Sequence, residues 1–233
     1  KASVIKRLGL ASVILIILII LSIQFGWLTI NSFISLVGIL GFLIPTAYFI
    51  VMYRSPKTTD VERSRILAFI PLFVASVMFW SIQEQGSTIL ARFADQRTQL
   101  EFLGITLSPA WFQSLNPLFI ITLAPVFAWL WMKLGNKQPS IPQKFSLGLL
   151  FAGLSFLVIL VPALLGGENS LVSPLWLVLS YLVVVIGELC LSPVGLSATT
   201  KLAPAAFSAQ TMSLWFLSNA AAQGLNAQIV KFY

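Results

Sequence analysis

Residues 69–93 read FIPLFVASVMFWSIQEQGSTILARF, and residues 175–196 read LWLVLSYLVVVIGELCLSPVGL. Each stretch is long and apolar enough to cross a bilayer as a helix, yet each contains one acid, Glu84 or Glu188. A carboxylate in hydrocarbon is costly unless it is protonated, paired or facing a wet cavity. The two acids are therefore candidate functional groups, and they predict a polar interior between helices.

The composition excludes a soluble domain. Hydrophobic residues make up 58% of the 233 residues, and charged residues make up only 9%, whereas soluble domains contain about 25% charged residues. Hydropathy predicts seven membrane helices, at about residues 8–24, 30–53, 66–92, 109–132, 145–165, 171–192 and 206–230. The chain is therefore predicted to be an all-α protein that crosses the membrane several times.

The basic residues fall mainly on one side of these predicted helices. Three of the 14, Arg92, Arg97 and Lys231, lie on the other side. The remaining eleven are Lys1, Lys6, Arg7, Arg54, Lys57, Arg63, Arg65, Lys133, Lys137, Lys144 and Lys201. This asymmetry predicts that the N-terminus of the segment is cytoplasmic, and it explains the net charge of +7 without a nucleic-acid partner.

Signals of a soluble enzyme or a metalloprotein are absent from the sequence. The single cysteine, Cys190, lies within a predicted helix, and there is no histidine, so neither a disulfide nor a histidine-ligated metal is expected. We find no phosphate-binding glycine loop and no nucleophile elbow. The two membrane acids could form a general acid/base pair in an intramembrane enzyme, but the other chemistry that such enzymes need is missing.

Polar residues gather around Glu84 on the third predicted helix. Gln83 and Gln85 flank the acid, and the residues spaced to share its helical face are Trp80, Ser87 and Thr88. Bulk water normally solvates such groups, so the cluster predicts a hydrated cavity. The alternative is a network of hydrogen bonds that holds neighbouring helices together.

Glu188 shares its predicted face with Tyr181 and Ser192. The following Pro193 and Gly195 are expected to loosen the end of this helix near residue 192. Helix breakers at membrane depth free backbone carbonyls, which favours a substrate site. The alternative is a terminal kink beside an acid that serves only as an ion-pair partner.

The last predicted helix carries a polar stripe at spacings of 4, 4, 4 and 3, formed by Thr211, Trp215, Asn219, Gln223 and Asn226. Trp215 lies in the middle of the span rather than at an interface, so a cavity role and a packing role both remain open. On the fourth helix, Asn116 precedes Pro117 and either caps the kink or faces a substrate.

Three motifs follow one another along the chain: FWSIQEQGS at 79–87, NPLFI at 116–120 and GELCLSPVGLS at 187–197, with TKLAP at 200–204 after the third. In this order and spacing they resemble the proton-coupled oligopeptide transporter family in its bacterial form. The resemblance covers nearly the whole chain but only the second half of a family member. The family's first-half motifs have no counterpart here, so we expect the chain to be incomplete.

The resemblance implies a symporter that imports di- and tripeptides together with protons. Glu84 matches the family's proton-coupling acid, and Glu188 and Asn116 match the pair that holds the peptide's ammonium group. Trp80 and Trp215 match aromatic residues that line the pocket. Further candidate substrate-binding residues, taken from their places near the acids or on the polar stripe, are Gln83, Ser192 and Asn219.

The implied fold is that of the major facilitator superfamily, with twelve core helices in two bundles. Residues 1–53 would form an extra hairpin between the bundles, residues 54–65 a cytoplasmic linker, and residues 66–233 five helices of the C-terminal bundle. The expected partners are a peptide, a proton, the lipid bilayer of the plasma membrane and the N-terminal half of the transporter. The remaining alternatives are a transporter of another solute, such as nitrate or a drug, and a structural membrane subunit.

Overall fold

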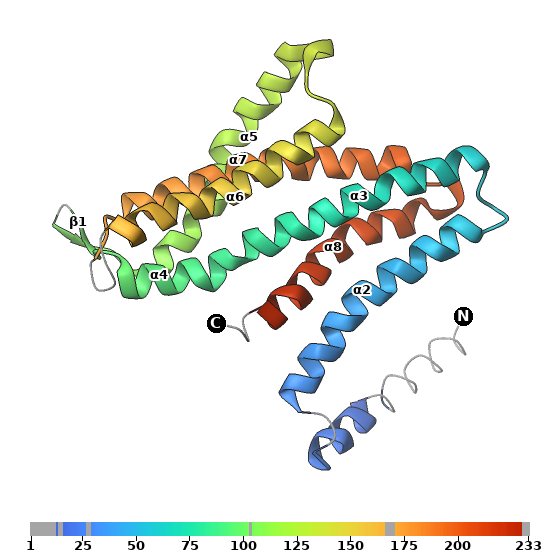
Figure 1. Ribbon diagram of the computed structural model, residues 1–233, viewed down its shortest axis with the longest axis horizontal. Coiled ribbons are helices and arrows are strands. Elements are labelled where there is room, and N and C mark those ends of the chain that lie inside the picture. Colours follow the sequence, from blue (N-terminus) through green and yellow to red (C-terminus); the bar gives the residue numbers. More distant parts are fainter. Residues whose placement is uncertain (1–12, 14–15, 27–28, 103, 166–170, 230–233) are drawn as a thin grey trace.

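The computed structural model describes residues 13, 16–26, 29–102, 104–165 and 171–229. These residues form a bundle of long helices with a small β-hairpin at one end (Figure 1). In that hairpin β1 (Glu101–Phe102) pairs antiparallel with β2 (Ile105–Thr106). Of the first predicted helix, residues 8–12, 14 and 15 lie outside the described residues, and residues 16–24 are helical.

The long helices are α2 (Ile30–Arg54), α3 (Asp60–Gln83), α5 (Leu115–Leu134), α6 (Ile141–Leu165), α7 (Leu175–Leu202) and α8 (Ser208–Ile229). The short ones are α4 (Ile89–Arg97) and the 3₁₀ turns η1 (Glu84–Ser87), η2 (Pro109–Ser114), η3 (Gly135–Lys137) and η4 (Ala205–Phe207).

Within the described residues, five segments are both long and apolar enough to cross a membrane: Asn31–Arg54, Asp60–Arg97, Pro109–Lys137, Ile141–Pro162 and Leu175–Leu202. Helix α8 has the length but not the apolar character, because serine, asparagine and glutamine residues interrupt it.

The predicted third helix is not continuous. Regular α-helix ends at Gln83, the 3₁₀ turn η1 follows, and α4 then runs to Arg97. The expected common face of Trp80, Glu84, Ser87 and Thr88 is therefore wrong, because a 3₁₀ turn advances through a different angle per residue. Ser87 and Thr88 instead donate locally, Ser87 to the Glu84 carbonyl at 2.8 Å and Thr88 to the Gln85 side chain at 2.7 Å.

The connection before α3 is shorter than the linker predicted at 54–65, since α3 already begins at Asp60. Thr59 and Glu62 form a capping box, in which each side chain accepts a hydrogen bond from the other's backbone N–H. The second oxygen of Glu62 accepts from the backbone N–H of Ala205 at 2.8 Å. One carboxylate therefore fixes the start of α3 and ties it to the connection between α7 and α8.

Helix α7 does not end near residue 192 as expected. Pro193 lies inside it, and the helix continues to Leu202. A proline removes one backbone hydrogen bond, which a packed membrane helix tolerates when neighbouring groups satisfy the freed backbone. The Thr199 hydroxyl donates to the Gly195 carbonyl at 2.8 Å just beyond the proline.

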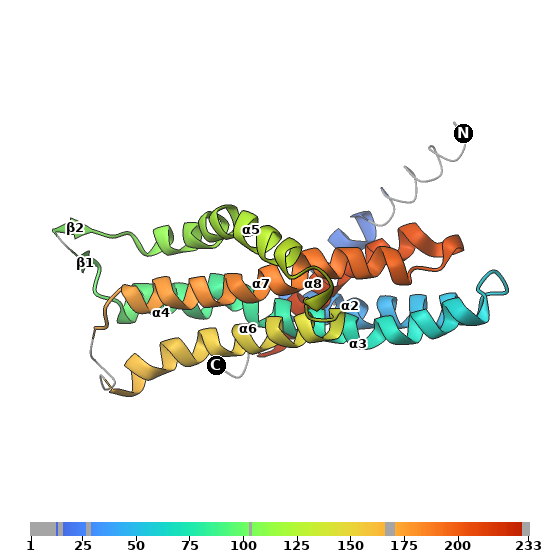
Figure 2. The same cartoon turned by 90° about the horizontal axis from the view of Figure 1, so that it is seen from above.

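Helices α6 and α7 lie side by side in both views (Figures 1 and 2). Their closest approach is made by two glycines. A Cβ at Gly148 would lie 2.9 Å from the Leu191 Cβ, and one at Gly187 would lie 2.7 Å from the Gly148 carbonyl oxygen. Small residues of this kind allow helix backbones to pack closely in a membrane.

We expect Gly148→Ala to destabilise the protein by about 1–3 kcal/mol, because the added methyl group forces α6 and α7 apart. Gly153→Ala is the matched control on the same helix, since no heavy atom lies within 4 Å of its Cβ position. The apparent Tm of the purified protein should fall for the first variant only. Equal Tm values would mean that the α6–α7 contact contributes nothing.

The main hydrophobic core lies among α2, α3, α6, α7 and α8, around Phe69, Phe79, Leu191, Leu214 and Ala221. A second cluster joins α4 and η2 to α6 and α7, around Leu90, Phe112, Ile159, Leu177 and Tyr181. Figure 1 shows the α2–α3 and α7–α8 connections toward one end of the bundle and the β-hairpin at the opposite end.

Candidate functional site

The Glu188 carboxylate lies where α3, α5 and α7 meet. Its Oε2 accepts a hydrogen bond from Gln83 Nε2 at 2.9 Å and another from Asn116 Nδ2 at 3.4 Å. The side chain is half-buried in the middle of α7. Three residues predicted separately from sequence, each from a different helix, are therefore brought together at one carboxylate oxygen.

Glu84 has a different partner. Its Oε1 accepts a hydrogen bond from Asn219 Nδ2 on α8 at 3.1 Å. Glu84 stands at the first position of η1, directly after Gln83, which binds Glu188. The two membrane acids are thus linked through adjacent residues, Gln83 at the end of α3 and Glu84 at the start of η1, but each is held by a different set of helices.

The break in α3 that places these two side chains is fixed by hydrogen bonds to Gly86. Its carbonyl oxygen accepts from the Tyr181 hydroxyl at 3.2 Å and from Gln113 Nε2 at 3.3 Å. A Cβ at Gly86 would lie 3.6 Å from the Tyr181 ring, so the backbone approaches the ring closely. Outside donors thereby replace the regular helical hydrogen bonds that the 3₁₀ turn gives up.

Sequence reasoning missed Gln113 and the role of Gly86. Gln113 lies inside the fourth predicted helix, at 109–132, but the structure places it in the 3₁₀ turn η2 before α5. It has no helical spacing to either acid, so only the folded chain connects it to the site. Tyr181 had been placed on the Glu188 face but contacts Gly86 instead. In the sequence, Gln113 is marked only by its polarity and Gly86 only by its position near Glu84.

The polar stripe predicted on α8 does not form one face. Successive residues four apart drift by about 40° around a helix with 3.6 residues per turn. Thr211 contacts Met52 of α2, Asn219 binds Glu84 of α3, and Gln223 is exposed. The stripe therefore serves several neighbours rather than one cavity.

Part of this polarity holds helices together, as the alternative interpretation expected. The Ser76 and Ser218 hydroxyls lie 2.8 Å apart, and Asn226 Nδ2 donates to the Ser81 carbonyl at 3.0 Å while its Oδ1 accepts from the Ser81 hydroxyl. These buried pairs join α3 to α8 on the same pair of helices as the Glu84–Asn219 bond.

The two candidate tryptophans have different environments. Trp215 is only 3% exposed, packs its ring against the Gly195 backbone and meets Phe145 edge-on at 6.2 Å between ring centres. Trp80 is partly buried and meets Phe79 edge-on at 5.5 Å. Ser192, one turn beyond Glu188, is half-buried and makes no side-chain hydrogen bond within the described residues.

Neither membrane acid pairs with a lysine or arginine in the described part of the chain, where the recorded salt bridge joins Arg63 to Asp60 at 2.9 Å. Gln83 also has a buried Oε1 without a hydrogen-bond partner. The Glu188 site thus offers a negative charge and an unused acceptor, which suits a cationic group with several N–H donors. No three acid or cysteine side chains of the described residues converge to hold a metal ion.

A sequence model of the POT family matches residues 2–233. The chain belongs to this family. Its relatives include an uncharacterized transporter YclF of Bacillus subtilis (strain 168), 62% identical over 97% of this chain and 46% of that protein. A di-/tripeptide transporter of Lactococcus lactis subsp. cremoris is 46% identical over 88% of this chain and 42% of that protein.

Solved structures of POT transporters match the fold of this chain over nearly its whole length. A peptide transporter POT in complex with sulfate is 71% identical, with a TM-score of 0.93 over 100% of this chain and 47% of that one. A POT family transporter in complex with 5-aminolevulinic acid is 46% identical, with a TM-score of 0.88 over 97% and 47%. The predicted family and the all-α membrane fold of the major facilitator type are confirmed.

This POT chain spans about half the length of the relatives that it matches.

Proposed function

We propose that this chain supplies the C-terminal bundle of a proton-coupled symporter that imports di- and tripeptides by alternating access. The observation that carries the proposal is Glu188, a half-buried carboxylate with two amide donors and no basic partner among the described residues. An ammonium ion binds strongly to such a group because the surrounding dielectric is low. Di- and tripeptides carry an ammonium group at their amino end, and relatives of this chain are named di-/tripeptide transporters.

Gln83 and Asn116 would orient Glu188 toward the peptide. Both amides donate to the same oxygen, Oε2, so Oε1 is left to accept from the ammonium group. Two donors also offset the cost of a negative charge away from water. Glu188 would therefore stay ionised and act as a fixed charge. Trp80, Trp215, Ser192 and Asn219 complete the proposed substrate-binding set.

Glu84 would carry the coupling proton, with no other cofactor. Burial disfavours a charged carboxylate, whereas an approaching cation favours it. Among the described residues, the Glu84 carboxylate accepts a hydrogen bond from the Asn219 amide alone, and its basic partner is expected on the other bundle. If the protonated and ionised forms favour different packings of the two bundles, proton binding drives alternating access.

The N-terminal half of the transporter is the proposed partner of this chain. Helix α5 supplies Asn116 to the site, yet none of its residues is buried, which supports a further bundle packed against it. In this arrangement residues 1–53 form the hairpin between bundles and residues 66–233 the second bundle. Residues 54–65 form the cytoplasmic segment between them, which includes the first turns of α3.

The protein is proposed to lie in the plasma membrane with the N-terminus of this segment in the cytoplasm. Eleven of the 14 basic residues lie on the side of the α2–α3, α5–α6 and α7–α8 connections or before the first predicted helix. Short loops of this kind are cytoplasmic in most membrane proteins.

The test is uptake of a labelled dipeptide by proteoliposomes that contain the full-length transporter. We expect accumulation when a proton gradient, acidic outside, is imposed, and no accumulation after the gradient is collapsed. Nitrate or drug uptake without peptide uptake would assign the fold to another solute. Absence of all uptake from correctly folded protein would leave the enzyme or structural alternative.

A further inference from the structure

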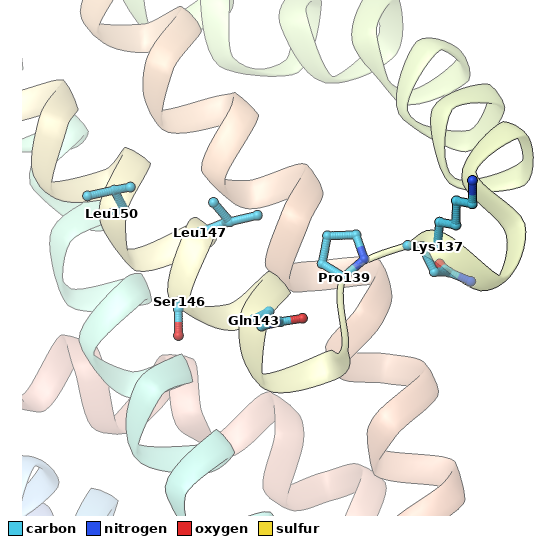
Figure 3. Close-up of a pocket in the computed structure, with 7 residues that line it drawn as sticks. Lys137, Pro139, Gln143, Ser146, Leu147 and Leu150 are labelled. Carbon is cyan, nitrogen blue, oxygen red and sulfur yellow. The ribbon is translucent and has the colours of Figure 1, made fainter.

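A shallow pocket lies at the start of α6, beside the connection from α5. It has a volume of about 540 Å³ and is lined by Lys137, Gln138, Pro139, Gln143, Ser146, Leu147 and Leu150. Figure 3 shows Lys137 and Pro139 on the connection from α5, with the remaining labelled side chains following one another along α6. None of these residues belongs to the proposed peptide site.

Along α6 from its N-terminal end, the side chains that line the pocket are first polar and then apolar. Gln143, Ser146, Leu147 and Leu150 follow at helical spacings of three, one and three residues, so they form one stripe. The stripe continues as exposed leucine and valine residues: Leu154, Leu157, Val161 and Leu164. From Leu147 to Leu157 it extends about 15 Å, roughly half of the hydrocarbon thickness of a bilayer.

The polar end of the pocket is rich in hydrogen-bond donors. Gln138 Oε1 accepts from the Lys144 ammonium at 2.7 Å, and Gln143 Oε1 accepts from the Ser140 backbone N–H at 2.8 Å. In the described part of the chain neither amide nitrogen donates a hydrogen bond of its own. Both NH₂ groups are therefore available to an acceptor. Lys137 lines the same pocket.

The charged residues in the stretch of sequence that forms the pocket are all basic. No aspartate or glutamate occurs between Glu101 and Glu168, whereas Lys133, Lys137 and Lys144 all lie in this stretch. Lys144 lies over the Trp131 ring at 4.2 Å from its centre, and Lys133 lies over the Trp129 ring at 4.6 Å. Tryptophan and lysine at the end of a membrane helix are typical of the lipid headgroup region.

We propose that this pocket binds the headgroup of an anionic phospholipid of the cytoplasmic leaflet, with an acyl chain along the α6 stripe. The phosphate accepts from Lys137 and from the Gln138 and Gln143 amides, because these are the donors that the protein leaves unused. Lys144 acts indirectly, since it orients Gln138 by binding its oxygen. The proposal depends on the orientation of the chain in the membrane, but not on the transported solute.

Binding is tested on the full-length transporter by native mass spectrometry during titration with phosphatidylglycerol and, separately, phosphatidylcholine. We expect tighter binding of phosphatidylglycerol, and for Lys137→Gln a loss of about fivefold, which corresponds to about 1 kcal/mol per basic residue near anionic lipid. Lys57→Gln is the matched control, because it removes the same charge from another exposed connection on that side of the bundle. Its affinity should not change.

A phosphatidylglycerol analogue with a photoreactive acyl chain locates the site independently. We expect cross-links to the α6 peptide that contains Leu147 and Leu150, and no displacement by inorganic phosphate. Displacement by phosphate would mean that the pocket binds a free anion rather than a lipid. Equal affinity for the two lipids, equal effects of the two lysine variants, or cross-links confined to other helices would each overturn the proposal.

Discussion

Glu84→Gln is expected to abolish proton-driven accumulation of peptide while peptide exchange across the membrane continues. Asn219 Nδ2 donates to the Glu84 Oε1 at 3.1 Å, and a glutamine keeps an acceptor oxygen at that place. The variant therefore preserves the size and the hydrogen bond of the side chain and removes only its titration. Without a group that changes charge, the proton gradient no longer shifts the balance between inward- and outward-facing packings.

Two transport measurements on the same proteoliposomes check this result. Uptake under an imposed proton gradient should fall to the background of protein-free vesicles, and counterflow of labelled against unlabelled peptide should remain. Glu101→Gln in the β1–β2 hairpin is the control, since it removes an exposed acid far from α8 in the sequence. Concentrative uptake by Glu84→Gln at the normal level would refute the proton-coupling role.

Glu188→Gln is expected to weaken the binding of dipeptides with a free amine by roughly thirtyfold or more. Removing one partner of a desolvated charge pair costs about 2–5 kcal/mol. Gln83 and Asn116 remain able to donate to the new side-chain oxygen, since both bind the Oε2 position now. The loss therefore reports the negative charge rather than a collapse of the three-helix contact.

The contrast between substrates is what identifies the partner of Glu188. Binding of an N-acetylated dipeptide, which has no ammonium group, should change little in the same variant. The measurement is the Kd of each peptide for the purified full-length transporter, before and after substitution. A loss of equal size for both peptides would show that Glu188 supports the structure of the site instead of the ammonium group.

The two variants also separate the proposed roles from each other. Gln83 at the end of α3 and Glu84 at the start of η1 are adjacent but bind different partners, on α7 and α8 respectively. If both acids served only to hold helices together, the two variants would lower Tm and affect all substrates alike. Loss of coupling in one variant and loss of ammonium binding in the other would assign the two acids separate functions.

Much of the fold could be predicted from local sequence. Apolar stretches of sufficient length predict α2, α5 and α6 closely, because in hydrocarbon the backbone must satisfy its own hydrogen bonds and a helix is the only single-segment solution. The acids at Glu84 and Glu188, and the amides at Gln83, Asn116 and Asn219, stood out for the same reason. Polar groups are costly at membrane depth, so their presence alone marks an interior site.

Which of those groups meet one another was decided by the tertiary structure. Hydrogen bonds from Tyr181 and Gln113 to the Gly86 carbonyl stabilise the change from α-helix to 3₁₀ turn. Because the helix type changes between them, Gln83 and Glu84 reach different partners. Helical spacing cannot predict such a break, because its stabilising donors come from η2 and α7, distant in the sequence. Pro193 gives the converse case, since packing keeps α7 helical where local propensity predicts an end.

The sequence by itself thus determined the helices and the polar residues within them, since both depend on the cost of exposing polar groups to lipid. Contacts between distant segments determined the partner of each acid.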